Sequence, residues 1–112
     1  MLYRLDRYDS FVDEKWFVGD SDLGGLPEEA YLGICIAGEA GEVAEKLKKA
    51  YRDSGGRVDR LAMCRELGDV AYYLTRYAHR LGYTLAQVLD ENVAKLNDRE
   101  SRGVLRGSGD RR

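Results

Sequence analysis

The sequence predicts an all-α protein, with four helices in one domain of 112 residues. The chain contains a single proline, Pro27, which leaves long stretches free to form helices. Apolar residues recur at intervals of three and four along these stretches, as they do on one face of a helix. Clusters of glycine, serine and aspartate separate the stretches, as expected for turns.

The composition is that of a soluble globular protein. Hydrophobic residues make up 44% of the chain and charged residues 34%, with a net charge of −2, which excludes a dedicated nucleic-acid binder and a disordered chain. No apolar run approaches the roughly 20 residues of a membrane span, and the N-terminus does not resemble a signal peptide. We therefore expect a cytoplasmic protein with no nucleic-acid or membrane partner.

The two cysteines are expected to be reduced residues of the core. Cys35 and Cys64 lack the CxxC spacing and the flanking histidines of a zinc site. A cytosolic protein also rarely keeps disulfides.

The N-terminal part, residues 1–26, is predicted to be a helix followed by a loop. The helix spans about residues 2–17 and has an aromatic, imperfect apolar stripe. Residues 19–27 are rich in glycine and polar residues, which indicates a loop. Pro27 then occupies the first turn of the second helix, where proline is favourable.

The second helix is predicted over about residues 27–52. Its last turns are basic, which is favourable at the negative end of the helix dipole. Asp53, Ser54, Gly55 and Gly56 end it. The residues of its buried stripe recur at helical spacing: Leu32, Ile36, Val43, Leu47 and Ala50.

The third helix, about residues 59–81, carries apolar residues on more than one face. Three neighbouring helices in so small a domain do not easily cover such a helix. The pattern therefore favours a partner that packs against it.

The fourth helix begins after Thr84, which forms a capping box with Gln87, and runs to about residue 101. Residues 27–101 thus hold the three helices that carry the candidate chemistry. The glycine-rich, basic residues 102–112 are predicted to be a flexible tail.

Two pairs of carboxylates are the most informative feature of the chain. Glu39 with Glu42, and Glu66 with Asp69, are each spaced three residues apart, so each pair projects from one face of its helix. Two antiparallel helices would aim all four at one point, where they repel one another unless a cation lies between them. Oxygen ligands suit Mg²⁺ or Mn²⁺, and Mg²⁺ sites commonly include a substrate phosphate. The pattern predicts a metal-dependent enzyme that acts on a phosphorylated substrate.

Glycines accompany these acidic pairs. Gly38, Gly41 and Gly68 each cost roughly 1 kcal/mol relative to alanine inside a helix. Close approach of a neighbouring backbone would explain them, either around a shared cation or in ordinary tight packing. A solvated helix face remains the alternative for the carboxylates, and it is the favoured interpretation for Glu45, which continues the first row.

These motifs resemble those of the MazG-type all-α nucleoside triphosphate pyrophosphohydrolases. That family has ExxE, then ExxD, then NxxK on the next helix, and Asn92 and Lys95 follow the two acidic pairs in that order. The resemblance covers about residue 28 to the C-terminus. It implies a four-helix MazG-like bundle that assembles as a homodimer or homotetramer. It also implies Mg²⁺-dependent hydrolysis of a nucleoside triphosphate to the monophosphate and pyrophosphate, with Mn²⁺ as a substitute ion.

The resemblance also implies roles for individual residues. Glu39, Glu42, Glu66 and Asp69 would be metal ligands, and one of them, with a weak preference for Glu39, would be the general base. Asn92 would contact the sugar or base. Three cations would hold phosphate oxygens: Lys95, Lys49 and Arg99.

Several other residues have two interpretations. His79 is expected at the surface or an interface, too far from Asp69 to join its site. A solvated tail is favoured over a lid formed by Arg102, Arg106, Arg111 and Arg112. Core or interface packing is likewise favoured over base stacking for three aromatic residues: Trp16, Tyr31 and Tyr73.

Other functions remain open from the sequence. Phosphoribosyl-ATP pyrophosphohydrolase and dCTP- or dUTP-specific enzymes share the acidic motifs, and the residues that separate them are not readable. A di-iron carboxylate bundle would require Glu-x-x-His repeats, which this chain lacks. A catalytically silent dimerisation module would be expected to have degraded acidic motifs, whereas these are intact.

Overall fold

The computed structural model describes residues 2–109, and the all-α prediction is confirmed for them. No strand occurs in this range. The four α-helices are accompanied by two short 3₁₀-helices near the N-terminus, Leu5–Arg7 and Asp20–Asp22. The α-helices, in chain order, are α1 (Tyr8–Lys15), α2 (Glu28–Asp53), α3 (Arg60–Arg80) and α4 (Leu85–Ser101).

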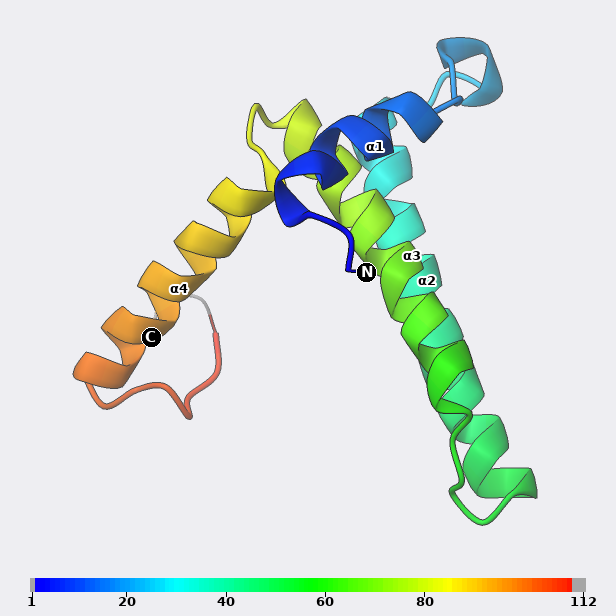
Figure 1. Ribbon diagram of the computed structural model, residues 1–112, viewed down its shortest axis with the longest axis vertical. Coiled ribbons are helices and arrows are strands. Elements are labelled where there is room, and N and C mark those ends of the chain that lie inside the picture. The colour runs from blue at the N-terminus through cyan, green and yellow to red at the C-terminus, as the bar shows by residue number, and fades with distance from the viewer. Residues whose placement is uncertain (1, 110–112) are drawn as a thin grey trace.

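The helices α2 and α3 form a long antiparallel hairpin (Figure 1). The turn between them places Gly55 and Gly56 at φ +63° and +84°, a left-handed conformation that glycine adopts without strain. Asp59 then caps α3, because its side chain accepts a hydrogen bond from the amide of Ala62 at 3.0 Å. The hairpin is the scaffold on which both acidic pairs lie.

The helix α1 is shorter than predicted and packs against α3. It lacks a side-chain cap, and its end is set at Trp16, whose backbone is extended. Its residue Val12 is fully buried. The Trp16 indole donates to a Glu28 carboxylate oxygen at 2.8 Å and lies 5.0 Å below the Arg76 guanidinium, which fixes α1 to both helices of the hairpin.

The predicted capping box at the start of α4 is confirmed. The Thr84 hydroxyl accepts from the Gln87 amide at 3.2 Å, and the Gln87 side chain accepts from the Thr84 amide at 2.8 Å. From this cap α4 runs away from the hairpin, so that the molecule has two arms (Figure 1). The predicted bundle is therefore not closed within one chain.

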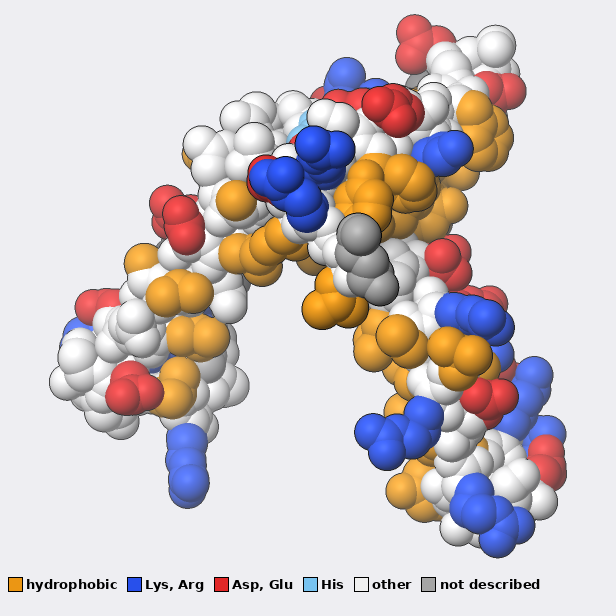
Figure 2. Space-filling view, viewed as in Figure 1, with side chains coloured by type: hydrophobic (Ala, Val, Ile, Leu, Met, Phe, Trp, Pro, Cys, Tyr) orange, Lys and Arg blue, Asp and Glu red, His pale blue; other side chains and the backbone are white. Residues whose placement is uncertain are grey.

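Both arms expose apolar side chains. Figure 2 shows hydrophobic side chains along each arm and at the junction between them. On α3, Leu61 and Leu67 are 60% and 55% exposed, and on α4 Val93 is 57% exposed. The broadly apolar third helix predicted from the sequence is thus left partly uncovered by its own chain.

The cysteine prediction is half right. Both cysteines are free, and Cys35 is partly buried, but Cys64 on α3 is exposed and so is not a core residue of the chain. None of the helices within residues 2–109 has the length and apolarity needed to cross a bilayer.

Candidate functional site

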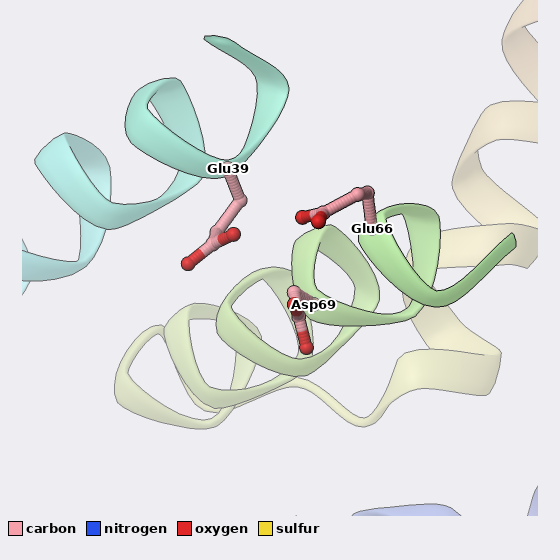
Figure 3. Close-up of side chains that lie close together, drawn as sticks. All are labelled: Glu39, Glu66 and Asp69. Carbon is pink, nitrogen blue, oxygen red and sulfur yellow. The ribbon is translucent and has the colours of Figure 1, made fainter. Parts of the chain in front are cut away.

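The hairpin brings three of the four predicted carboxylates together. Glu39 projects from α2, and Glu66 and Asp69 project from α3 into the same space (Figure 3). One carboxylate oxygen of each lies within 4.8 Å of the others. The antiparallel pairing of the helices and the three-residue spacing on α3 create this acidic cluster.

The acidic cluster concentrates negative charge at Glu39. Burial raises the pKa of Glu39, and the nearby carboxylates of Asp69, Glu66 and Glu42 raise it further. A cation placed among these oxygens would remove the repulsion. The electrostatics of the cluster therefore match those of a cation site.

Glu42 lies outside the group of three. It is exposed on α2, one turn after Glu39, and it acts on Glu39 through its charge. The structure thus separates the predicted quartet into three converging carboxylates and a fourth at their edge.

A lysine that the sequence reasoning missed borders the acidic cluster. Lys46 Nζ lies 3.6 Å from Glu66 Oε1 across the hairpin. Lys46 follows Glu39 by seven residues, which is two helical turns and the same face of α2, so this spacing was a readable signal.

Lys49 lies further along α2, where its ammonium is 3.7 Å from Glu45. Glu45 also pairs with Lys48 at 2.9 Å, which supports its interpretation as a surface charge. Lys46 and Lys49 line a pocket of about 290 Å³ at the closed end of the hairpin, together with Arg57. Asp53 and Asp59 line the same pocket, and Lys46 connects it to the acidic cluster through Glu66.

The three glycines do not serve a close contact within one chain. A Cβ atom added at Gly38, Gly41 or Gly68 would meet nothing within 4 Å. The expected close approach of a neighbouring backbone is therefore not found within the chain at any of the three glycines. They leave the surface around the carboxylates open instead.

The other predicted substrate contacts are on α4. Asn92 and Lys95 are exposed there, and the structure does not bring this arm to the acidic cluster of the same chain (Figure 1). Arg99 is only 5% exposed, and its guanidinium lies 3.5 Å from the carbonyl of Gly109.

The first part of the tail folds back on the end of α4. The Val104 amide donates to the Arg99 carbonyl at 2.9 Å, and the Arg99 guanidinium donates to the Gly109 carbonyl at 3.5 Å. Arg102 pairs with Asp98 on its own helix at 2.9 Å. Arg111 and Arg112, which the lid hypothesis includes, lie outside the described residues.

His79, expected at the surface or an interface, lies where α3 contacts α1. Its ring nitrogens lie 2.6 Å from Asp9 Oδ1 and 2.9 Å from Asp13 Oδ1, and its side chain is 15% exposed. The spacing to Asp69 correctly excluded it from the acidic cluster. Its role is to join α3 to α1, which no spacing within one helix reveals.

The aromatic residues that were candidates for base stacking contact one another. The Trp16 ring lies 6.4 Å from each of the Tyr31 and Tyr73 rings, and 6.2 Å from the Tyr72 ring. This mutual packing supports the core interpretation of Trp16, Tyr31 and Tyr73.

The chain is similar in sequence to known proteins. Gene 37 protein of Mycobacterium phage L5 is 38% identical over 114 residues, which covers 99% of this chain and 96% of the phage protein. No solved structure matches. The family described as the MazG nucleotide pyrophosphohydrolase domain matches residues 28–104, a range that contains the acidic cluster, Asn92 and Lys95 but excludes α1. The chain belongs to the MazG nucleotide pyrophosphohydrolase domain family.

Proposed function

We propose that this protein hydrolyses ribo- or deoxyribonucleoside triphosphates to the monophosphate and pyrophosphate, with Mg²⁺ as the cofactor and Mn²⁺ as a substitute. The observation that carries the proposal is the convergence of Glu39, Glu66 and Asp69 within 4.8 Å of one another, inside the family match. Such an enzyme would control or clean the nucleotide pool.

The donor set fits a hard divalent cation. All three converging groups offer oxygen, which Mg²⁺ and Mn²⁺ prefer and which zinc sites seldom use alone. Glu39, Glu66 and Asp69 would hold the ion, with Glu42 beside them. When bound, such an ion neutralises phosphate charge and lowers the pKa of a coordinated water.

The side chains of this chain supply the remaining roles. Glu39 is our choice for the general base, because it is the one converging carboxylate on α2 and lies opposite Glu66 and Asp69, beside the place where an ion and its water would bind. Lys46 and Lys49 lie along α2 where they would pair with phosphate oxygens. The neighbouring cations would thereby orient the triphosphate across the acidic cluster.

A second copy of the chain would complete the site. The two arms leave apolar residues of α3 and α4 exposed, and burial of such surface between subunits is favourable. We therefore propose a homodimer or homotetramer in which Asn92 and Lys95 approach the acidic cluster of another subunit.

The test is pyrophosphate release from a panel of ribo- and deoxyribonucleoside triphosphates, in Mg²⁺ and in EDTA. Glu39→Gln should abolish release, while Glu45→Gln, a matched change on the same helix outside the acidic cluster, should preserve it. Failure to cleave any triphosphate would refute the proposal. Phosphoribosyl-ATP is then the next substrate to assay, and ligand binding without turnover would indicate a non-catalytic module.

A further inference from the structure

The segment outside the family match borders the acidic cluster. A pocket of about 620 Å³ opens between α1 and α3, within the range of small-molecule sites. Tyr8 and Phe11 of α1 line it, and so does Asp69, a member of the acidic cluster. The pocket and the acidic cluster are therefore continuous.

One wall of the pocket is aromatic. The Tyr8 and Phe11 rings stack with centroids 5.8 Å apart and planes inclined by 22°, and Tyr72 of α3 also lines the pocket. Tyr3 packs edge-on against both stacked rings, at 6.4 Å from Tyr8 and 5.9 Å from Phe11. Stacked rings that line an open pocket form a surface on which a planar base can lie.

The rim of the pocket carries positive charge. Lys15 Nζ lies 5.8 Å from the centroid of the Phe11 ring, and Arg65 lines the pocket from α3. Cations at these positions would donate hydrogen bonds to the carbonyl groups of a base or to the phosphates beside it. The pocket thus combines aromatic side chains, cations and Asp69 of the acidic cluster. These groups suit the base, the phosphates and the metal ion of a metal-bound nucleotide.

Tyr8 connects the aromatic wall to the acidic cluster. Burial raises the pKa of the Tyr8 hydroxyl, with further contributions from Tyr72 and Asp69. A tyrosine hydroxyl is protonated at neutral pH, so that of Tyr8, which lines the pocket with Asp69, is available as a hydrogen-bond donor. By contrast, the Trp16 indole already donates to Glu28 and packs within its own aromatic group.

We propose that this pocket binds the base of the nucleoside triphosphate, with Tyr8 and Phe11 as the stacking surface and Lys15 and Arg65 as polar contacts. The inference rests on the proposed function, because the acidic cluster must hold the phosphates for the base to reach α1. Three of these four residues, Tyr8, Phe11 and Lys15, belong to α1, which lies outside the family match. Part of the substrate recognition would therefore come from outside the family's domain.

The test is calorimetric binding of a non-hydrolysable α,β-methylene nucleoside triphosphate in Mg²⁺. Phe11→Ala should weaken binding about tenfold, as expected for loss of one base–aromatic stack. Phe11→Leu, which keeps apolar volume at the Val12 core, should show most of the same loss. Phe17→Ala is the matched control, because Phe17 follows α1 but is 86% exposed and does not line the pocket.

Inorganic triphosphate separates base binding from phosphate binding. It should bind equally to the wild type and to Phe11→Leu, because it has no base. Unchanged nucleotide affinity in both Phe11 variants would overturn the pocket assignment while leaving the proposed hydrolysis intact. Nucleotide binding that depends on Phe11, without pyrophosphate release by the wild type, would uphold the pocket and refute the hydrolysis. A wild type that binds no nucleotide would overturn both.

Discussion

Nε2 of His79 on α3 lies 2.6 Å from Oδ1 of Asp9 on α1. The other ring nitrogen faces Asp13 at 2.9 Å, and a neutral imidazole has only one N–H to donate, so both contacts require the protonated ring. The same Asp9 oxygen accepts the Leu85 amide at 2.9 Å. His79 and Asp9 therefore join α1, α3 and the start of α4.

This link predicts that stability falls as pH rises above neutrality. Burial lowers the pKa of His79, but hydrogen bonds to Asp9 and Asp13 outweigh it and raise the pKa above 6.5. A raised histidine pKa stabilises the fold fully below pH 6.5, and this contribution is lost as pH rises through the folded value. The thermal unfolding midpoint, followed by circular dichroism, should decrease as pH rises above 6.5.

His79→Gln tests the origin of that decrease. The variant should have a lower midpoint than the wild type at pH 6 and a flatter profile above it, because glutamine does not titrate. Parallel profiles for the two proteins would show that another group is responsible.

The same cluster predicts a separate loss of stability in acid. Burial raises the pKa of Asp9, whereas hydrogen bonds from His79 and the Leu85 amide lower it more, to below its ordinary value of 3.8. A depressed carboxyl pKa contributes stability above pH 3.8 that disappears as pH falls through the folded value. Asp9→Asn should therefore destabilise the protein at pH 6 and show a smaller further loss of midpoint on acidification to about pH 3.

Glu39→Gln is predicted to stabilise the metal-free protein and to weaken its response to Mg²⁺. The raised pKa of Glu39 means that its ionised form is disfavoured in the fold, a cost that vanishes as pH falls through the folded pKa or when the charge is removed. In EDTA the variant should melt above the wild type. Its Mg²⁺ affinity should fall at least about tenfold, measured as the metal-induced shift in midpoint.

Glu45→Gln serves as the control for that comparison. Glu45 pairs with Lys48 instead of facing other carboxylates, so its loss should leave the response to Mg²⁺ unchanged. An equal effect of both substitutions on the metal-induced shift would contradict the assignment of the acidic cluster.

Lys46→Gln is predicted to tighten Mg²⁺ binding and to raise the KM for a triphosphate. Lys46 lies 3.6 Å from Glu66, so its charge opposes a cation in the acidic cluster and favours phosphate nearby. Calorimetry should show about two- to fivefold tighter Mg²⁺ binding, the range expected for a partly exposed pair. Lys48→Gln, which removes the same charge from a lysine paired with Glu45, should change neither quantity; weaker Mg²⁺ binding in Lys46→Gln would refute the argument.

Features that depend on one helix were predictable from the sequence. The Thr84–Gln87 capping box and the three-residue spacing of Glu66 and Asp69 need only helical geometry, and both are found as expected. Helix existence was predictable for the same reason. The least accurate predicted boundaries were those of α1, which spans Tyr8–Lys15 instead of about residues 2–17.

Apart from the convergence of Glu39 with Glu66 and Asp69 across the hairpin, features that depend on how helices meet were not predictable. The contact of His79 with Asp9 spans 70 positions and follows from how α1 lies on α3. The base pocket was missed for the same reason, since Phe11 and Asp69 share no motif. The direction of α4 follows from tertiary packing. The separation of Lys95 from the acidic cluster within one chain could therefore not be predicted from the sequence either.

That separation predicts that the active site is shared between subunits. Glu39→Gln and Lys95→Ala should each abolish or strongly reduce pyrophosphate release as pure proteins. Mixing them at equal concentration after partial unfolding and refolding should restore about a quarter of wild-type activity, because half the dimers are mixed and each has one intact site. Mixing Glu39→Gln with Glu66→Gln should restore no activity. Both changes lie in the acidic cluster of one chain, so no mixed dimer has an intact site. No recovery in the first mixture would mean that each chain builds its site alone. Recovery in the second would mean that Glu39 and Glu66 of one site come from different subunits, against the arrangement in the hairpin.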